Sequence, residues 1–185
     1  MIEDTIKSTE SRMQKSIEAM TRDLASIRTG RASTALVEHL SVDYYGAPTP
    51  LNQLATIAIP EPRLITIQVW DKQAVLSIEK AILKSDLGLN PSNDGTVIRL
   101  PVPALTQDRR RELAKLVKKR TEEARIAVRN VRRDGIEELR GLEKQKEISQ
   151  DDQHRGQDRI QTLTDSYVAK VDEVGIQKEA ELMEV

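Results

Sequence analysis

The chain has 185 residues and a formal net charge of −1, with charged residues at 32%, aromatic residues at 2% and no Phe. This composition is typical of long exposed helices rather than of one compact globule. Cysteine is absent, which excludes disulfides, cysteine-based zinc sites and thiol nucleophiles. No apolar run approaches the roughly 18 residues that a membrane helix needs, and the first twenty residues carry no apolar export signal. We therefore expect a cytoplasmic protein that does not enter a membrane.

The first predicted element is a helix over residues 2–29. Its apolar residues form one seam over three heptads, namely Ile6, Met13, Met20 and Ile27, with Ile17 and Leu24 between them. Gly30 follows, as glycine commonly does at a helix C-terminus.

The segment 31–104 changes to period-two alternation and contains all seven prolines. Strands are predicted around 40–44, 57–59, 65–69 and 97–100, separated by turns at 46–48, 60–62 and 93–95. A helix over 72–87 places Val75, Ile78 and Ile82 on one face. This segment is predicted to be a small α+β domain.

Helical periodicity returns after residue 106. A helix over 107–146 carries an apolar stripe at 3.6-residue spacing, made by Leu113, Val117, Ala124, Val128, Val131, Gly135, Leu139 and Leu142. Ser149, followed by two aspartates, is a candidate N-cap for a third helix. The inner face of that helix is predicted to carry Ile160, Leu163, Tyr167, Val171 and Val174.

Three apolar stripes must be buried against one another. The sequence therefore predicts an α+β protein of two domains: an antiparallel three-helix bundle from residues 1–30 and 105–185, with residues 31–104 inserted. The two chain crossings, near residues 30–31 and 103–105, would allow the domains to hinge.

Charge is distributed unevenly along the chain. Residues 106–133 carry 11 basic and four acidic side chains, whereas residues 134–185 carry seven basic and 14 acidic ones. On a helical projection one flank of the second long helix collects Arg111, Lys118, Arg125, Arg129 and Arg132. Most of these cations lack an acidic neighbour within their own helix, although the acidic third helix could neutralise some of them. A row of arginines is typical of a surface that meets a polyanion, here RNA phosphate.

Catalysis is not indicated. His39 and His154 each lie near aspartates and could belong to a metal or acid–base site, but a solvated polar face is the simpler interpretation because metal sites need three or four convergent ligands. Phosphate-binding, dinucleotide and nucleophile-elbow motifs are absent. We expect no catalytic residue, no metal, no cofactor and no small-molecule substrate.

Six short motifs follow one another along the chain: Arg-Thr-Gly-Arg-Ala at 28–32, Tyr-Tyr-Gly at 44–46, Asp-Leu-Gly-Leu-Asn-Pro at 86–91, Leu-Thr with two arginines at 105–110, Val-Arg-Asn-Val-Arg-Arg-Asp at 128–134, and Lys-Glu-Ile-Ser with two aspartates at 146–152. This order is the one seen in bacterial ribosome recycling factors, which the chain resembles over its whole length. Departures are minor: Thr34 stands where proline is frequent, and Gln107 and Asp108 where two glutamates are commoner.

The resemblance implies an L-shaped, tRNA-like monomer whose inserted domain is a β/α/β sandwich. Its partners would be the ribosome, at large-subunit rRNA, and elongation factor G, whose GTP hydrolysis would drive splitting of the post-termination ribosome into subunits. The RNA-contact candidates, from the resemblance and from the basic flank together, are Arg28, Arg31, Arg110, Arg125, Arg129, Arg132 and Arg133. The hinge would consist of Gly30, Arg31, Pro103, Ala104 and Leu105.

Two other classes remain open. A generic helical-bundle adaptor or RNA-binding protein would explain the heptads but not the inserted domain. A metal-dependent hydrolase would need one of the histidines to bind metal.

Overall fold

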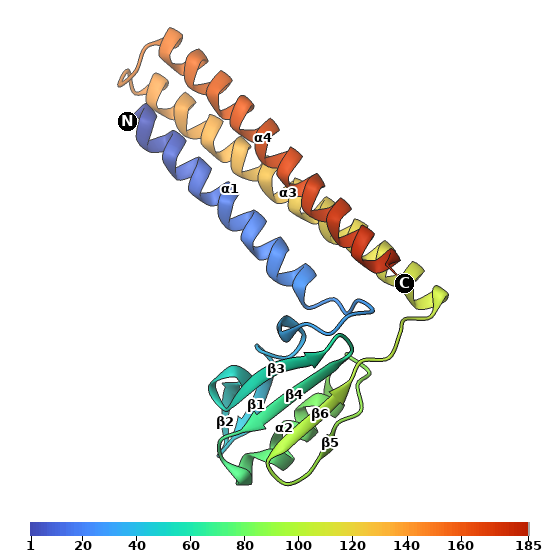
Figure 1. The fold of residues 1–185 in the computed structure, drawn as a ribbon. Coiled ribbons are helices and arrows are strands. Elements are labelled where there is room, and N and C mark those ends of the chain that lie inside the picture. The colour runs from blue at the N-terminus through green and yellow to red at the C-terminus, as the bar shows by residue number, and fades with distance from the viewer. Residues whose placement is uncertain (185) are drawn as a thin grey trace. The chain divides into compact units, whose positions relative to one another are not determined.

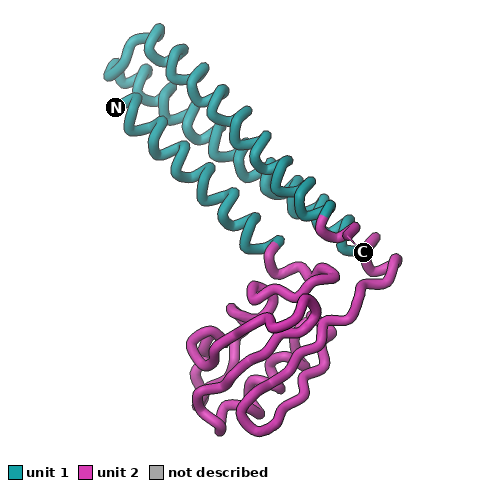
Figure 2. The backbone as a smooth tube through the Cα atoms, in the orientation of Figure 1, with its two compact units in different colours: residues 1–24, 112–180 teal, residues 25–111, 181–185 magenta. Residues whose placement is uncertain are grey.

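The computed structural model describes residues 1–184, which divide into two compact units (Figure 2). Residues 1–24 and 112–180 form unit 1, and residues 25–111 form unit 2 together with the end of the chain from residue 181. Within the described residues, no helix combines the length and apolarity that crossing a membrane requires.

Unit 1 is a bundle of three long helices that run side by side (Figure 1). Helix α1 spans Ile2–Ala25, α3 spans Gln107–Lys144 and α4 spans Gln150–Met183. Helix α3 runs antiparallel to the other two (Figure 1), because a short turn joins it to α4. That turn contains Lys146 at a φ of 60°, and the Ser149 hydroxyl caps α4 by accepting a hydrogen bond from the Asp152 amide. The predicted antiparallel three-helix bundle is therefore confirmed.

The predicted apolar stripes of α1 and α3 form much of the bundle core. Met13, Val117, Val128 and Leu139 are fully buried. Helix α4 differs from its prediction, because Leu163 and Val174 are only partly buried. Small and polar residues take up much of its inner face, namely Gln153, Gly156, Thr164 and Gly175.

Glycines let the helices approach closely at two levels of the bundle, at Gly135 and at Gly175. A Cβ placed on Gly135 of α3 would lie 2.6 Å from Thr9 Oγ1 of α1, and one on Gly175 of α4 would lie 2.5 Å from Thr121 Oγ1 of α3. The two buried threonine hydroxyls donate to carbonyl oxygens one turn earlier in their own helices, at 2.8 Å each. The helices can therefore touch without leaving a buried polar group unpaired.

Unit 2 contains two antiparallel sheets and a helix (Figure 1). Strands β1 (Ser41–Tyr44) and β2 (Ala47–Pro50) form a hairpin. The larger sheet has the order β3-β4-β6-β5, and its strands span Ala55–Glu61, Leu64–Val69, Val97–Pro101 and Ser92–Asn93 respectively. Helix α2 spans Val75–Lys84, and three short 3₁₀ turns lie at Thr34–Leu36, Leu51–Gln53 and Lys72–Ala74.

One apolar core holds unit 2 together. Ile65 and Ile67 of β4 and Ile98 of β6 are fully buried against Ile78 of α2 and Val42 of β1. Because all these side chains belong to one cluster, α2 and the hairpin cover the same face of the larger sheet. The predicted sandwich with one helix is confirmed.

Several predicted boundaries are wrong. The first helix ends at Ala25 rather than at 29, and the Arg28 side chain beyond it bonds to the backbone carbonyls of residues 87 and 103. The predicted helix over 72–87 begins as a 3₁₀ turn and stops at Lys84, where the Ser85 hydroxyl donates to the Ile82 carbonyl.

Two predicted turns are displaced by one or two residues: they lie at 45–46 rather than 46–48, and at 62–63 rather than 60–62. Residues 47–50 pair with β1 although two of them are prolines, and the turn itself consists of Tyr45 (φ 51°) and Gly46 (φ 83°). Pro60 likewise lies within β3, beside a register shift between Ala58 and Glu61. Proline is tolerated at such edge and bulged positions because no ladder hydrogen bond needs its missing amide proton.

The close approach at Gly175 predicts that Gly175→Ala destabilises the protein. The added methyl group would overlap the buried Thr121 side chain, and overpacking of this kind costs about 1–3 kcal/mol. Chemical denaturation monitored by circular dichroism measures this change.

A matched control lies in α3. Nothing stands within 4 Å of a Cβ on Gly141, so Gly141→Ala should raise the stability by up to about 1 kcal/mol through helix propensity. In a Thr121→Ala background the cost of Gly175→Ala should fall. An unchanged cost would show that Thr121 is not the obstacle.

Candidate nucleic-acid interface

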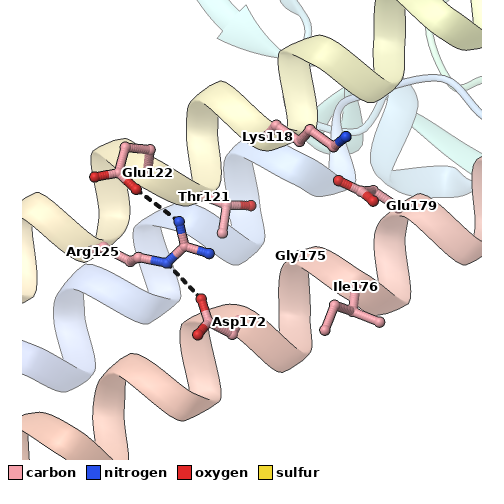
Figure 3. A pocket seen from close by; sticks show the side chains of 8 residues that line it. All are labelled: Lys118, Thr121, Glu122, Arg125, Asp172, Gly175, Ile176 and Glu179. Carbon is pink, nitrogen blue, oxygen red and sulfur yellow. Dashed lines mark hydrogen bonds and ion pairs between the residues drawn. The ribbon is translucent and has the colours of Figure 1, made fainter.

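Arg125 lies at the centre of the basic flank of α3, and two carboxylates hold it. Its Nη1 is 2.7 Å from Glu122 of the same helix, and its Nε is 2.6 Å from Asp172 of α4 (Figure 3). The hydrogen bonds to Glu122 and Asp172 raise the pKa of Arg125 above its usual value. Arg125 is therefore a bridge between two helices, which corrects the expectation that it belongs to an uncompensated row.

The bridge crosses a groove between α3 and α4. This groove has a volume of about 500 Å³, and Thr121 and Gly175 lie at its closest point (Figure 3). Lys118 and Glu179 lie further along it on opposite helices (Figure 3). The groove thus carries charges of both signs.

Arg132 meets a neutral amide of α4, although the acidic character of that helix allowed for an ion pair. Its Nη1 donates to Gln161 Oε1 of α4 at 3.0 Å, and Gln161 in turn donates to Asp165 at 2.9 Å. The Arg132 Nε is buried without a hydrogen-bond partner. No direct ion pair between Arg132 and an acid of α4 occurs in the part of the chain that the structure describes, so its positive charge is not cancelled as that of Arg125 is.

Arg129 and Arg133 are the RNA-contact candidates of unit 1 that are exposed. Neither forms an ion pair with any residue between 1 and 184. Arg129 also lines a second groove of about 430 Å³ beside Arg132 and Asp165. Arg129 and Arg133 therefore present full charges to solvent on unit 1.

The remaining candidates belong to unit 2. Arg28 donates from Nη2 to the Pro103 carbonyl at 2.6 Å and from Nη1 to the Leu87 carbonyl at 3.4 Å. Burial lowers the pKa of Arg28, and the nearby charge of Arg109 lowers it further. Through these bonds the Arg28 side chain connects two separate backbone segments of unit 2.

Arg110 and Arg31 have weaker local roles. Arg110 is half-buried, and its Nε has no hydrogen-bond partner. Arg31 is exposed and lies 3.4 Å from Glu184. Both remain candidates for RNA contact because no buried interaction occupies their charges.

The residues next to the two predicted hinge segments are hydrogen-bonded to the turn between β3 and β4 in unit 2. The Ala32 amide donates to the Pro62 carbonyl, and the Val102 amide donates to the Arg63 carbonyl, both at 2.7 Å. The predicted hinge residues Gly30, Arg31, Pro103, Ala104 and Leu105 all belong to unit 2.

The histidines are not brought together with other ligands. His39 precedes β1 instead of lying in it, and its nearest acid is the adjacent Glu38 at 3.5 Å. Among residues 1–184 no group of three potential metal ligands occurs.

Asp172 and Gln161 were not predicted individually. The sequence did contain a pattern that pointed to an acidic face, because Asp165 and Asp172 are seven residues apart and therefore share one face of α4. The sequence could not show which arginine each would meet, since this depends on how α4 packs along α3.

The fold and the site define the class: a three-helix bundle with an arginine-bearing flank, joined to a small α+β unit. A sequence profile described as ribosome recycling factor matches residues 20–183. A ribosome-recycling factor from Chloroflexus aurantiacus is 60% identical over 185 residues, and one from Syntrophomonas wolfei is 57% identical, with full coverage of both chains in each case. The chain belongs to the ribosome recycling factor family.

Solved structures agree with this assignment. A solution structure of ribosome recycling factor has a TM-score of 0.78 and 48% identity, covering 100% of this chain and 98% of the other. A second structure, with a TM-score of 0.68 and 44% identity over the full length of both chains, describes the T. thermophilus ribosome recycling factor and the E. coli elongation factor G bound to the E. coli post-termination complex.

The ion pairs of Arg125 predict that Arg125→Ala lowers stability, whereas Arg129→Ala does not. Removing Arg125 leaves Asp172 without its cation and should cost about 1 kcal/mol. Arg129 has no such partner among the described residues. Thermal melts of the two variants test this, and equal melting temperatures would contradict the structural role of Arg125.

Proposed function

We propose that this protein binds the post-termination ribosome at large-subunit rRNA and, together with elongation factor G and GTP, splits it into subunits. The observation that carries the proposal is the unpaired positive charge of Arg129 and Arg133 on the exposed flank of α3, in a chain of this family. The solved relative that is bound with elongation factor G to a post-termination complex supports the choice of partners.

The bundle is the proposed ribosome-binding element. Arg129, Arg132 and Arg133 would contact phosphates of the rRNA, because an arginine guanidinium pairs well with phosphate oxygens. Of the chain's four aromatic residues only Tyr167 lies in the bundle, and it is buried. We therefore assign recognition to phosphate position and RNA shape rather than to stacked bases.

The other RNA-contact candidates would contribute less to ribosome binding. Arg31 and Arg110 would add contacts from unit 2. The RNA role of Arg125 and Arg28 would be indirect, because each already holds protein groups.

The chain itself is proposed to be a monomeric translation factor of the cytoplasm, with no catalytic group of its own. GTP hydrolysis would belong to elongation factor G. Motion between the helical domain, residues 1–30 and 105–185, and the inserted domain, residues 31–104, would transmit its effect.

The proposed phosphate contacts predict a salt-dependent loss of binding. Arg129→Ala and Arg133→Ala should each weaken ribosome binding by about 10- to 30-fold, and each should lower the slope of log K against log salt by roughly 0.7–0.9. Sedimentation with ribosomes across a salt series measures both quantities.

Glu137 offers a control on the same helix. It is exposed and acidic, so Glu137→Ala should not weaken binding and should not reduce the salt slope. If Arg129→Ala and Arg133→Ala leave both affinity and slope unchanged, the flank is not the RNA interface.

The proposed hinge predicts that Gly30→Pro impairs splitting more than binding. Proline fixes φ near −65° and restricts the connecting segment, while nothing crowds the Cβ position of Gly30. Subunit splitting by light scattering, compared with ribosome affinity, tests this. An equal loss of both would indicate that Gly30 serves the binding surface instead.

A further inference from the structure

Gln161 of α4 bonds to a cation on one side and to an anion on the other. Its Oε1 accepts a hydrogen bond from Arg132 Nη1 at 3.0 Å, and its Nε2 donates to Asp165 Oδ1 at 2.9 Å. A side-chain amide suits this place, because it carries an acceptor and donors on one uncharged group. The amide thus links Arg132 to Asp165, and no ion pair joins these two residues in the part of the chain that the structure describes.

These three side chains line a groove between α3 and α4. The groove has a volume of about 430 Å³ and also contains Asp172. Asp172 pairs with Arg125 Nε at 2.6 Å (Figure 3), and Asp165 accepts the Gln161 amide. Both carboxylates of the groove are therefore engaged by donors other than Arg132.

The Arg132 side chain is anchored but keeps one end of its guanidinium without a protein partner. The residue is half-buried, and its Nε lies inside the protein. Its Nη1 is taken by Gln161, whereas its Nη2 donates to no atom of residues 1–184. A guanidinium that is already held has few orientations left, so it loses less conformational entropy when Nη2 meets an external acceptor.

Arg125 shows what carboxylates do to an arginine of the same flank. It pairs with Glu122 and with Asp172 at 2.7 and 2.6 Å, so its charge is balanced within the protein. Arg125 and Arg132 are seven residues apart and therefore lie on one line of α3. On α4, Arg125 meets an acid and Arg132 meets an amide. An acid in place of the amide would cancel the charge of Arg132 in the same way.

We propose that Gln161 is a positioning residue for ribosome binding, whose amide fixes the Arg132 guanidinium in the groove and keeps Asp165 from neutralising it. This role rests on the proposed function, in which Arg132 contacts rRNA phosphate. Gln161 acts through Arg132 and not by touching RNA, since its two bonds are made within the protein. The side chain at position 161 thereby sets how much positive charge this part of α3 presents.

Other residue types would not meet both demands. A glutamate would accept from Arg132, but it would also cancel the charge and be repelled by Asp165. An apolar side chain would leave Arg132 without its acceptor and would release Asp165 to compete for the guanidinium. An ion pair would link the helices at least as strongly as the amide does. The choice of glutamine therefore serves the availability of the charge rather than stability.

Gln161→Glu tests this role, because it keeps the size of the side chain and changes its charge. We expect ribosome binding to weaken by about tenfold and the slope of log K against log salt to fall by roughly 0.7–0.9, as if one phosphate contact were lost. The melting temperature should stay the same or rise, since the new carboxylate can pair with Arg132. Sedimentation of the full-length chain with ribosomes across a salt series, together with thermal melts, measures these quantities.

Gln177→Glu is the matched control. Gln177 is exposed on the same helix, nearer its C-terminal end, so this variant has the same net charge and leaves Arg132 untouched. It should bind ribosomes as the unsubstituted chain does. Weakening equal to that of Gln161→Glu would show an effect of net charge alone and would overturn the proposal.

A double-mutant cycle shows whether Gln161 acts through Arg132. In an Arg132→Ala background, Gln161→Glu should weaken binding by less than about twofold, because its effect passes through the removed guanidinium. An undiminished effect in that background would overturn the positioning role.

Gln161→Met is a second variant, which adds no charge. It keeps the length of the side chain but removes both hydrogen bonds, so Arg132 loses its anchor. Binding should weaken by about three- to tenfold. Unchanged affinity of this variant would show that the bonds of Gln161 do not position Arg132, and would overturn the proposal.

Two further results separate this role from its alternatives. A lower melting temperature of Gln161→Glu with unchanged affinity would make Gln161 only a link between helices and would overturn the proposal. If Arg132→Ala weakens binding and Gln161→Glu does not, the positioning role fails and the proposed function stands. Unchanged binding by Arg132→Ala would instead overturn the RNA contact of Arg132 in the proposed function, and the role of Gln161 with it.

Discussion

Close contact between helices is the constraint on which unit 1 depends. At Gly135 and Gly175 the backbone of one helix meets a buried threonine of another, and any larger side chain would push the helices apart. The threonine hydroxyls bond within their own helices, so these contacts are apolar in effect. The spacing of α3 and α4 follows from this packing, and the position of every charge along their shared groove follows from that spacing.

The arginines of the basic flank differ in whether a neighbouring carboxylate neutralises their charge. Asp172 and Glu122 neutralise Arg125, whereas Arg132 meets only the neutral amide of Gln161. A carboxylate beside a guanidinium competes with phosphate for the same hydrogen bonds, and an amide oxygen competes less strongly. Residues that look equivalent on a helical wheel therefore differ in how far their positive charge is already neutralised within the protein.

Unit 2 uses an arginine in a different way. Its core is one continuous apolar cluster packed against the larger sheet. Arg28 clamps the connection at Pro103 and the turn at Leu87, so its charge supports the backbone of unit 2. The arginines that we propose as the main phosphate contacts are thus on α3, whereas Arg28 supports the backbone of unit 2.

The sequence by itself determined the elements and most of the core. Heptad spacing identified α1, the stripe from Leu113 to Leu139 identified the inner face of α3, and alternation identified β4 and β6. On α4 the sequence correctly identified Ile160, Tyr167 and Val171 as buried. Only the tertiary structure showed that Thr164 and Gly175 are buried there while Leu163 and Val174 are only partly buried, because close packing depends on size as well as on hydrophobicity. It also decided which arginine is paired: whether Asp172 reaches Arg125 or Arg132 depends on how far α4 is shifted along α3, and no spacing within one helix records that shift.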